Sequence, residues 1–229
     1  MTLGPQQLQV AILLPLIVVA SSVGATTPDP ADQTINQFLA QDDAQPAYRA
    51  VRRLVAENGS RKGWMEALTE YSPAAGFHFQ ITAEGGSGYI RSKVLTAVLE
   101  GEREVIANGE TARSSLALAN YRFQGNGIDS EGFANVLLVP RRKERVLISG
   151  TMFLKPTDGD LVRLQGRLAK SPSFWIKDVD IVRTYERIGG AVVPVALETK
   201  AQVRFLGDAT LRMTYVYTDI DGQPVSSAR

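Results

Sequence analysis

The run of alternating residues from Ala191 to Phe205 constrains the fold of this chain most strongly. Side chains alternate between the two faces of a β-strand, so alternation of apolar and polar residues predicts a strand with one apolar and one solvent-facing side. One parity comprises Val193, Val195, Leu197, Thr199, Ala201, Val203 and Phe205, and the other includes Pro194, Glu198, Lys200, Gln202 and Arg204. A sheet built from such strands must cover its apolar face with a second layer.

Further strands are expected at close spacing, and turn residues such as Asp158-Gly159, Gly189-Gly190 and Asp221-Gly222 separate several of them. The expected ranges are 63–71, 76–83, 119–123, 133–140, 145–155, 160–169, 175–187, 191–205 and 210–220. Tight turns between successive strands imply antiparallel order, and a sheet of about ten strands curls. The predicted fold class is α+β: a large curved antiparallel sheet, a half-open barrel, with helices covering its concave face.

Three helices are expected. A short one covers Thr34–Asp42, and a longer one runs from a Ser87 cap to about Asn108, with Gly109 as its stop. The longer helix carries a broad apolar stripe and lies between glycines suited to hinges, so we expect it to cover the sheet. A further short helix is expected at Glu110–Leu118.

The segment Tyr48–Glu57 fits either a helix or a strand. A helical stripe passes through Val51, Leu54 and Val55. Alternation by two also works, and its residues are Arg49, Val51, Arg53 and Val55. The sequence leaves both alternatives open.

The N-terminus resembles an export signal. Val10–Ala20 is an apolar run too short to span a bilayer comfortably, and Val23-Gly24-Ala25 supplies small residues for cleavage. Cleavage is favoured over an uncleaved membrane anchor, although the first nine residues contain no Lys or Arg. The predicted organisation is a signal at 1–25, a linker and short helix at 26–46, a curved-sheet domain at 47–222 and a tail at 223–229. The mature chain is expected in the periplasm or outside the cell, with no transmembrane span.

The composition argues against several kinds of chemistry. A formal charge of +1 disfavours nucleic acid as the main partner, and the absence of cysteine removes disulfides, thiol nucleophiles and the acylated Cys of a bacterial lipoprotein. His78 is the single histidine, it falls on a polar parity, and no Gly-x-Ser-x-Gly elbow accompanies it. The chain is predicted not to be an enzyme, with no catalytic residue, metal ligand or cofactor.

Two local features each have a structural and a binding interpretation. The Arg141–Arg145 segment is either a solvated hairpin loop or a docking patch for anionic lipid or protein. The string Ser171–Trp175 ends in two large aromatics, which either cap a core or line the mouth of a ligand cavity. The candidate ligand-binding residues are Trp64, Ile90, Val94, Val98, Met152, Phe174, Trp175, Met213 and Tyr215.

Two strings resemble the LolA-like superfamily, which includes periplasmic lipoprotein carriers, outer-membrane lipoprotein receptors and the RseB/MucB sensors of envelope stress. Gly150–Leu168, GTMFLKPTDGDLVRLQGRL, is similar to a hairpin of that superfamily, and Gly189–Tyr217 is similar to the pair of strands that follows. The resemblance covers roughly 48–222. It implies a bent antiparallel sheet with helices on its concave face, and an apolar cavity for acyl chains.

The chain departs from those proteins in two respects. It has no Cys for lipid attachment, so it is not itself an outer-membrane lipoprotein receptor. The binding arginine of the carriers has three candidate counterparts, Arg49, Arg52 and Arg53, and no motif selects among them.

The sequence therefore favours a soluble periplasmic or exported protein that binds lipid or the acyl chains of a lipoprotein between sheet and helical lid. The alternative is a non-enzymatic envelope interaction or sensor module that recognises protein. The oligomeric state is not predicted.

Overall fold

The computed structural model describes residues 30–41, 44–171, 176–203 and 207–225. The expected export signal, Phe174 and Trp175 lie outside these residues. The described part of the chain folds into one antiparallel sheet of eleven strands with helices on one side, as predicted. The strands are β1 (Tyr48–Asn58), β2 (Arg61–Ser72), β3 (Gly76–Gly86), β4 (Tyr121–Ile128), β5 (Ala134–Pro140), β6 (Ile148–Leu154), β7 (Leu161–Leu168), β8 (Ile176–Ile188), β9 (Ala191–Val203), β10 (Gly207–Ile220) and β11 (Gln223–Pro224).

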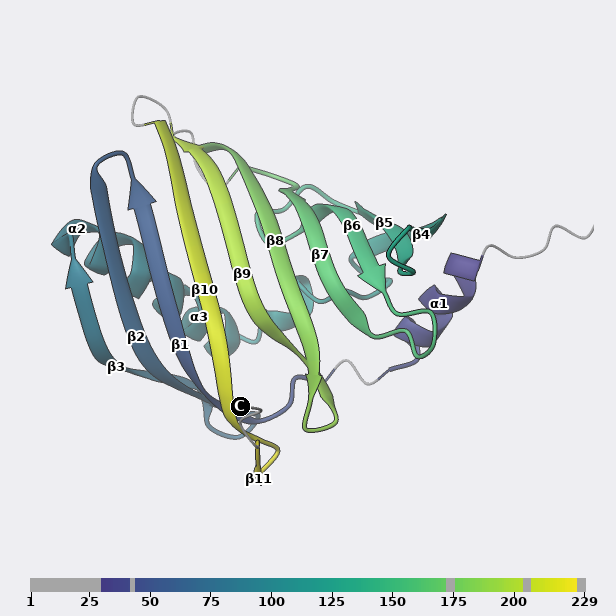
Figure 1. Cartoon of the computed structure of the whole chain (residues 1–229), viewed down its shortest axis with the longest axis horizontal. Coiled ribbons are helices and arrows are strands. Elements are labelled where there is room, and N and C mark those ends of the chain that lie inside the picture. Colours follow the sequence, from purple (N-terminus) through teal and green to yellow (C-terminus); the bar gives the residue numbers. More distant parts are fainter. Residues whose placement is uncertain (1–29, 42–43, 172–175, 204–206, 226–229) are drawn as a thin grey trace, which may run out of the picture.

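The sheet is curved and does not close into a barrel. Its strand order is β3-β2-β1-β10-β9-β8-β7-β6-β5-β4, with the short β11 beside β10. Ten neighbouring strands are therefore joined mainly as a meander, and the exception is the central pairing of β1 with β10, where Tyr48 lies opposite Ile220. Figure 1 shows the strands side by side across the molecule, with β3 and β4 at the two free edges.

The helices are α1 (Pro30–Leu39), α2 (Gly88–Ile90), the π-helical turn η1 (Arg91–Leu95), α3 (Thr96–Ala107) and the 3₁₀ turn η2 (Thr111–Arg113). Because α2, η1 and α3 follow one another without a break, we refer to residues 88–107 as the cover helix. The cover helix packs on β1, β2 and β3, whereas α1 packs on β4, β5 and β6 at the opposite end of the sheet (Figure 1). No helix among the described residues combines the length and hydropathy needed to cross a membrane.

The ends of the cover helix lie close to their predicted positions. Ser87 stands at the N-cap, but its side chain makes no capping hydrogen bond; its backbone N–H instead donates to the Lys62 carbonyl at 2.8 Å. Gly86 and Gly109, with φ of +82° and +68°, adopt the left-handed conformation that glycine accommodates at a chain reversal. Glycines in this conformation therefore stand at both ends of the cover helix.

The helix predicted at Glu110–Leu118 was wrong. Only Thr111–Arg113 forms a 3₁₀ turn, because the segment folds around the buried Asn120. The Asn120 amide donates to the carbonyls of Ala112 and Ser115, both at 2.8 Å. These side-chain bonds compete with the backbone bonds of a regular helix.

The ambiguous segment Tyr48–Glu57 forms strand β1. Val51 and Arg53, on the parity that also holds Arg49 and Val55, face outward, and the alternate residues face the concave side of the sheet. The inward residues are Tyr48, Ala50, Arg52, Leu54 and Ala56. A charged residue thus occupies the concave side of the sheet.

The main core lies between the sheet and its helices. It is continuous from the cover helix to α1 and contains residues from both ends of the sheet. Its fully buried members include Leu54, Met65, Ile90, Leu95, Leu99, Leu138, Met152, Leu154 and Leu164. A smaller cluster forms around Tyr48, Ala50, Val193, Tyr217 and Ile220.

Candidate functional site

Strand β1 positions Arg52 beneath the cover helix. Its neighbours on the same strand, Arg49 and Arg53, face outward and form ion pairs with Glu70 and Glu66 on β2. Arg52 is 1% exposed and is among the largest fully buried side chains. Of the three arginines considered from sequence, only Arg52 therefore lies in the interior.

Arg52 binds Glu102 of α3 through two hydrogen bonds. Nη1 donates to Oε2 at 2.5 Å, and Nη2 donates to Oε1 at 2.9 Å. Nη2 also donates to the Tyr48 hydroxyl at 2.5 Å. Paired, bidentate contacts of this kind are the strong ones in proteins. Burial disfavours the charged guanidinium, but the Glu102 bonds outweigh burial, and the pKa of Arg52 is raised.

Aromatic rings surround the same guanidinium. The Arg52 Cζ lies 4.7 Å from the ring centre of Tyr215, 4.9 Å from that of Phe77 and 5.8 Å from that of Tyr48. These faces attract a cation by their quadrupoles. Burial raises the pKa values of Tyr48 and Tyr215, so both hydroxyls stay neutral at physiological pH. Arg52, Glu102 and these rings form a polar centre within an otherwise apolar interface, which we call the Arg52 centre.

A second inward-facing arginine lies on β8. Arg183 pairs in register with Leu164 on β7 and Leu197 on β9, both of which belong to the main core. The Nε of Arg183 is buried and has no hydrogen-bond partner. The hydroxyls of Tyr185 and Tyr215 lie close enough to raise the pKa of its guanidinium, with a smaller contribution from Glu102. Arg183 therefore lies close to the Arg52 centre.

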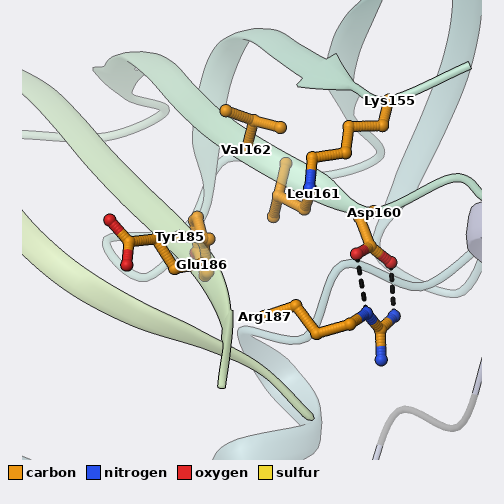
Figure 2. A pocket seen from close by; sticks show the side chains of 7 residues that line it. All are labelled: Lys155, Asp160, Leu161, Val162, Tyr185, Glu186 and Arg187. Carbon is orange, nitrogen blue, oxygen red and sulfur yellow. Dashed lines mark hydrogen bonds and ion pairs between the residues drawn. The ribbon is translucent and has the colours of Figure 1, made fainter. Parts of the chain in front are cut away.

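A pocket of about 320 Å³ opens at the end of β7 and β8, away from the cover helix. Figure 2 shows its lining and the two bonds between Arg187 and Asp160. Arg187 Nε donates to Asp160 Oδ2 at 2.7 Å, and the Gln41 amide donates to Asp160 Oδ1 at 3.3 Å. The Arg187 bonds, opposed by burial, lower the pKa of Asp160. The lining residues are Lys155, Asp160, Leu161, Val162, Tyr185, Glu186 and Arg187.

The structure brings together several of the residues proposed from sequence. Ile90 is buried on the cover helix, and Val94 and Val98 pack against the main core from the same helix. Met152 and Met213 are buried on the inner faces of β6 and β10. Tyr215 lies beside Arg52.

Trp64 is placed apart from those residues. It follows the outward parity of β2, where Arg53 Cζ lies 5.1 Å from its ring centre. Glu102 and Arg183 were not singled out from sequence. Glu102 is one of several acidic residues on its helix, and Arg183 stands in no motif. The neighbours of both residues in the fold depend on how distant segments pair.

The Arg141–Arg145 loop is partly structural. Arg141 Nε donates to the carbonyls of Leu118 and Tyr121, at 2.7 and 3.1 Å. Arg142 Nε pairs with Glu144 at 2.7 Å. Lys143 and Arg145 are exposed. Two of its four cations thus hold the loop itself in place.

The outer face of the sheet carries a short apolar row. Val51 lies opposite Val216 on one side and Leu68 on the other, so the three residues span β10, β1 and β2. Val51, Leu68 and Val216 are 36%, 37% and 59% exposed. Ion pairs of Arg49 with Glu70 and Arg53 with Glu66 flank the row.

Solved structures of similar fold share little sequence with this chain. A LolA superfamily protein from Nitrosomonas europaea is 9% identical, with 86% of this chain and 94% of that chain covered, at a TM-score of 0.43. A DUF1329 family protein from Desulfovibrio piger is 7% identical over 82% of this chain and 90% of that chain, at a TM-score of 0.38. For the Pseudomonas aeruginosa MucA/MucB complex the identity is 10%, the coverage 82% and 93%, and the TM-score 0.22.

No protein-family model and no curated protein matches the sequence. The solved structures similar to this chain thus include a LolA superfamily protein. The open curved sheet with helices on one side is the fold that the resemblance in sequence implied.

Proposed function

We propose that this protein is a non-enzymatic carrier of the bacterial envelope that shelters an acyl chain between its curved sheet and its cover helix. The structure then represents the closed state. The observation that carries the proposal is the Arg52–Glu102 pair, which joins the cover helix to the sheet through charge as well as packing. Buried ion pairs add little net stability compared with apolar packing, and their best attested role is to specify one arrangement over another.

The rest of the interface suits opening. Ile90, Leu95 and Leu99 are the fully buried side chains of the cover helix, and glycines reverse the chain at both of its ends. Exposing three such side chains costs roughly 6 kcal/mol. Each buried CH₂ of a ligand contributes about 0.8 kcal/mol, so a chain of about eight methylenes offsets the opening. Long acyl chains meet that condition, and short ones do not.

Location in the envelope belongs to the same proposal. It is supported by the export signal predicted at 1–25 and by the absence of cysteine from the sequence. The LolA superfamily likeness is in keeping with this location and with a carrier role.

The test uses a neutral ligand and a substitution in the Arg52–Glu102 pair, which joins the sheet to the cover helix. Titration with dodecanol, followed by displacement of Nile red, should show saturable binding. Because Glu102→Gln weakens the closed state, a loss of about 2 kcal/mol should raise the apparent affinity about thirtyfold. Glu104→Gln, at an exposed position on the same helix, is the matched control and should bind as the wild type does.

Native mass spectrometry of protein purified from the periplasm should detect bound lipid. A protein that never carries lipid and shows no saturable binding contradicts the proposal.

A second candidate is a module that recognises a protein of the envelope. The observation favouring it is the outward row of Val51, Leu68 and Val216, since exposed apolar side chains in a contiguous group mark contact surfaces. Under this alternative, Leu68→Asp and Val216→Asp remove photo-crosslinks to a periplasmic protein. Dodecanol binding, if present, remains unchanged in both variants.

A further inference from the structure

The concave face of the sheet contains more positive than negative charge. Arg52 and Arg183 both face the core, and Glu102 is already engaged by both Nη atoms of Arg52. Among the residues that the structure describes, no carboxylate lies within ion-pair distance of Arg183. The region around the Arg52 centre therefore carries one uncompensated cation.

Other arginines of the fold are satisfied differently. Arg141 donates to two backbone carbonyls, and Arg187 makes two bonds to the carboxylate of Asp160. Arg183 lies among Leu164, Leu197 and Ile181, which are at most 9% exposed. Its Nε has no acceptor, as is also true of Arg52, Arg91 and Arg163, but each of those three guanidiniums pairs with a carboxylate. The polar groups that act on Arg183 are the hydroxyls of Tyr185 and Tyr215, with a smaller contribution from Glu102. A partly buried cation without a counter-ion is costly, and a bound anion would supply that counter-ion.

The pocket at the end of β7 and β8 shares one residue, Tyr185, with the surroundings of Arg183, although Arg183 itself does not line it. Lys155 is another lining residue, and it forms no ion pair with any described residue. In Figure 2 the Lys155 side chain extends toward Leu161. The lining holds two cations, Lys155 and Arg187, and two carboxylates, Asp160 and Glu186, so the mouth is neutral overall and any selection of an anion falls to Arg183.

We propose that Arg183 recognises the anionic head of the ligand, so that the acyl compound bound here is an anionic amphiphile with a carboxylate or a phosphate. The head group pairs with the guanidinium of Arg183, and the chain lies along the inner faces of Leu164, Ile181 and Leu197. This assignment rests on the proposed function, because it specifies the ligand of that carrier site. It also gives Arg183 and Arg52 separate roles: Arg52 fastens the helix, and Arg183 selects the ligand.

The experiment compares three ligands of one chain length: laurate, dodecyl phosphate and dodecanol. Wild-type protein at neutral pH should bind at least one of the two anions about tenfold more tightly than dodecanol, and the preferred anion identifies the head group. Arg183→Met should weaken binding of that anion about tenfold while leaving dodecanol unchanged. Arg183→Lys should retain part of the preference. Arg212→Met, on the outer face of β10, is the matched control and should bind as the wild type does.

Unfolding in urea provides the second readout. Since Arg183→Met replaces a partly buried charge that has no ion-pair partner with an apolar side chain, the variant should be at least as stable as the wild type. A marked loss of stability would show that Arg183 is a structural residue and would overturn the assignment. Equal binding of anions and dodecanol, or an anion preference that survives in Arg183→Met, would overturn it as well. Failure of all three ligands to bind refutes the carrier function itself.

Discussion

Arg52 and Glu102, which are 50 residues apart in sequence, join the middle of strand β1 to the middle of helix α3 through two hydrogen bonds of 2.5 and 2.9 Å. The arginine is 1% exposed, whereas the side chain of Glu102 is 30% exposed. The pair is therefore open to water from the helix side and closed from the sheet side. Water therefore reaches the carboxylate of Glu102 more readily than the guanidinium of Arg52. We expect the ion pair to open from the helix side.

Replacing Glu102 by Gln should destabilise the cover helix more than the sheet. The variant leaves a buried guanidinium without its counter-charge, and the loss should be about 2 kcal/mol. Hydrogen exchange of residues 88–107 should become faster, while exchange in β8 and β9 should change little. Glu104→Gln is the control. Uniform acceleration throughout the protein would instead indicate global unfolding and would speak against a separately opening helix.

Two glycine substitutions should act in opposite directions. Gly150 and Gly166 lie opposite each other on β6 and β7, and a Cβ at Gly150 would come within 2.0 Å of the Gln165 carbonyl oxygen. Gly150→Ala should therefore cost more than about 3 kcal/mol, because backbone must move. Gly101 lies within α3 with open space around it, and Gly101→Ala should stabilise by about 0.5–1 kcal/mol. Urea denaturation measures both. A mild effect at Gly150 would contradict the close pairing of β6 and β7.

Asp160 should make the protein sensitive to acid. Its pKa is lowered, chiefly by the Arg187 bonds, so the stabilisation is present above the unfolded pKa near 4 and is lost as pH falls through the folded value. Asp160→Asn should be less stable than the wild type at neutral pH, and the difference should shrink below about pH 4. The measurement is urea unfolding across this range, with the exposed Asp208→Asn as control. A difference that does not depend on pH would remove the ion pair as its cause.

Alkaline pH should destabilise the fold through its buried tyrosines. Burial raises the pKa values of Tyr48, Tyr215 and Tyr217. The contribution of these tyrosines to the free energy of unfolding is complete below about pH 10. It is lost above that pH, because the unfolded chain releases protons that the folded chain retains. Tyr215→Phe should flatten the fall in unfolding free energy by up to about 1.4 kcal/mol per pH unit. The exposed Tyr89→Phe should not, and equal slopes for both variants would contradict burial as the cause.

The sequence predicted the sheet well, since alternation and turn residues are local signals. Strand β9 was expected at 191–205 and is described to Val203, and the meander from β6 to β10 follows the expected order. Local signals did not decide β1, where helix and strand stayed open. There the outward Val51 is apolar and the inward Arg52 is charged, so the pattern marks no apolar face. The inward position of Arg52 is explained by its contacts with Glu102 and three aromatic rings.

The candidate site was harder to predict than the fold. Val94, Val98, Met213 and Tyr215 were selected because apolar residues on the inner face are visible in a sequence pattern. The charges at its centre depend on pairing between distant segments, such as Tyr215 of β10 beside Arg52 of β1. The bond between Arg52 and Glu102, 50 residues apart, cannot be read from a local sequence pattern. The same holds for the Nε of Arg183, which has no acceptor.

The pairing of β1 with β10 has a kinetic consequence. Tyr48 and Ile220 are cross-strand neighbours on two inner strands of the sheet, although the chain between them forms nearly all of the remaining structure. During synthesis, β1 pairs with β2 early, but its other edge stays free until β10 has been made. Contacts of such long sequence separation form slowly. A chain halted before β10 would present β1 and β9 as unpaired edges, a form that is open to chaperones and to translocation before the sheet is complete.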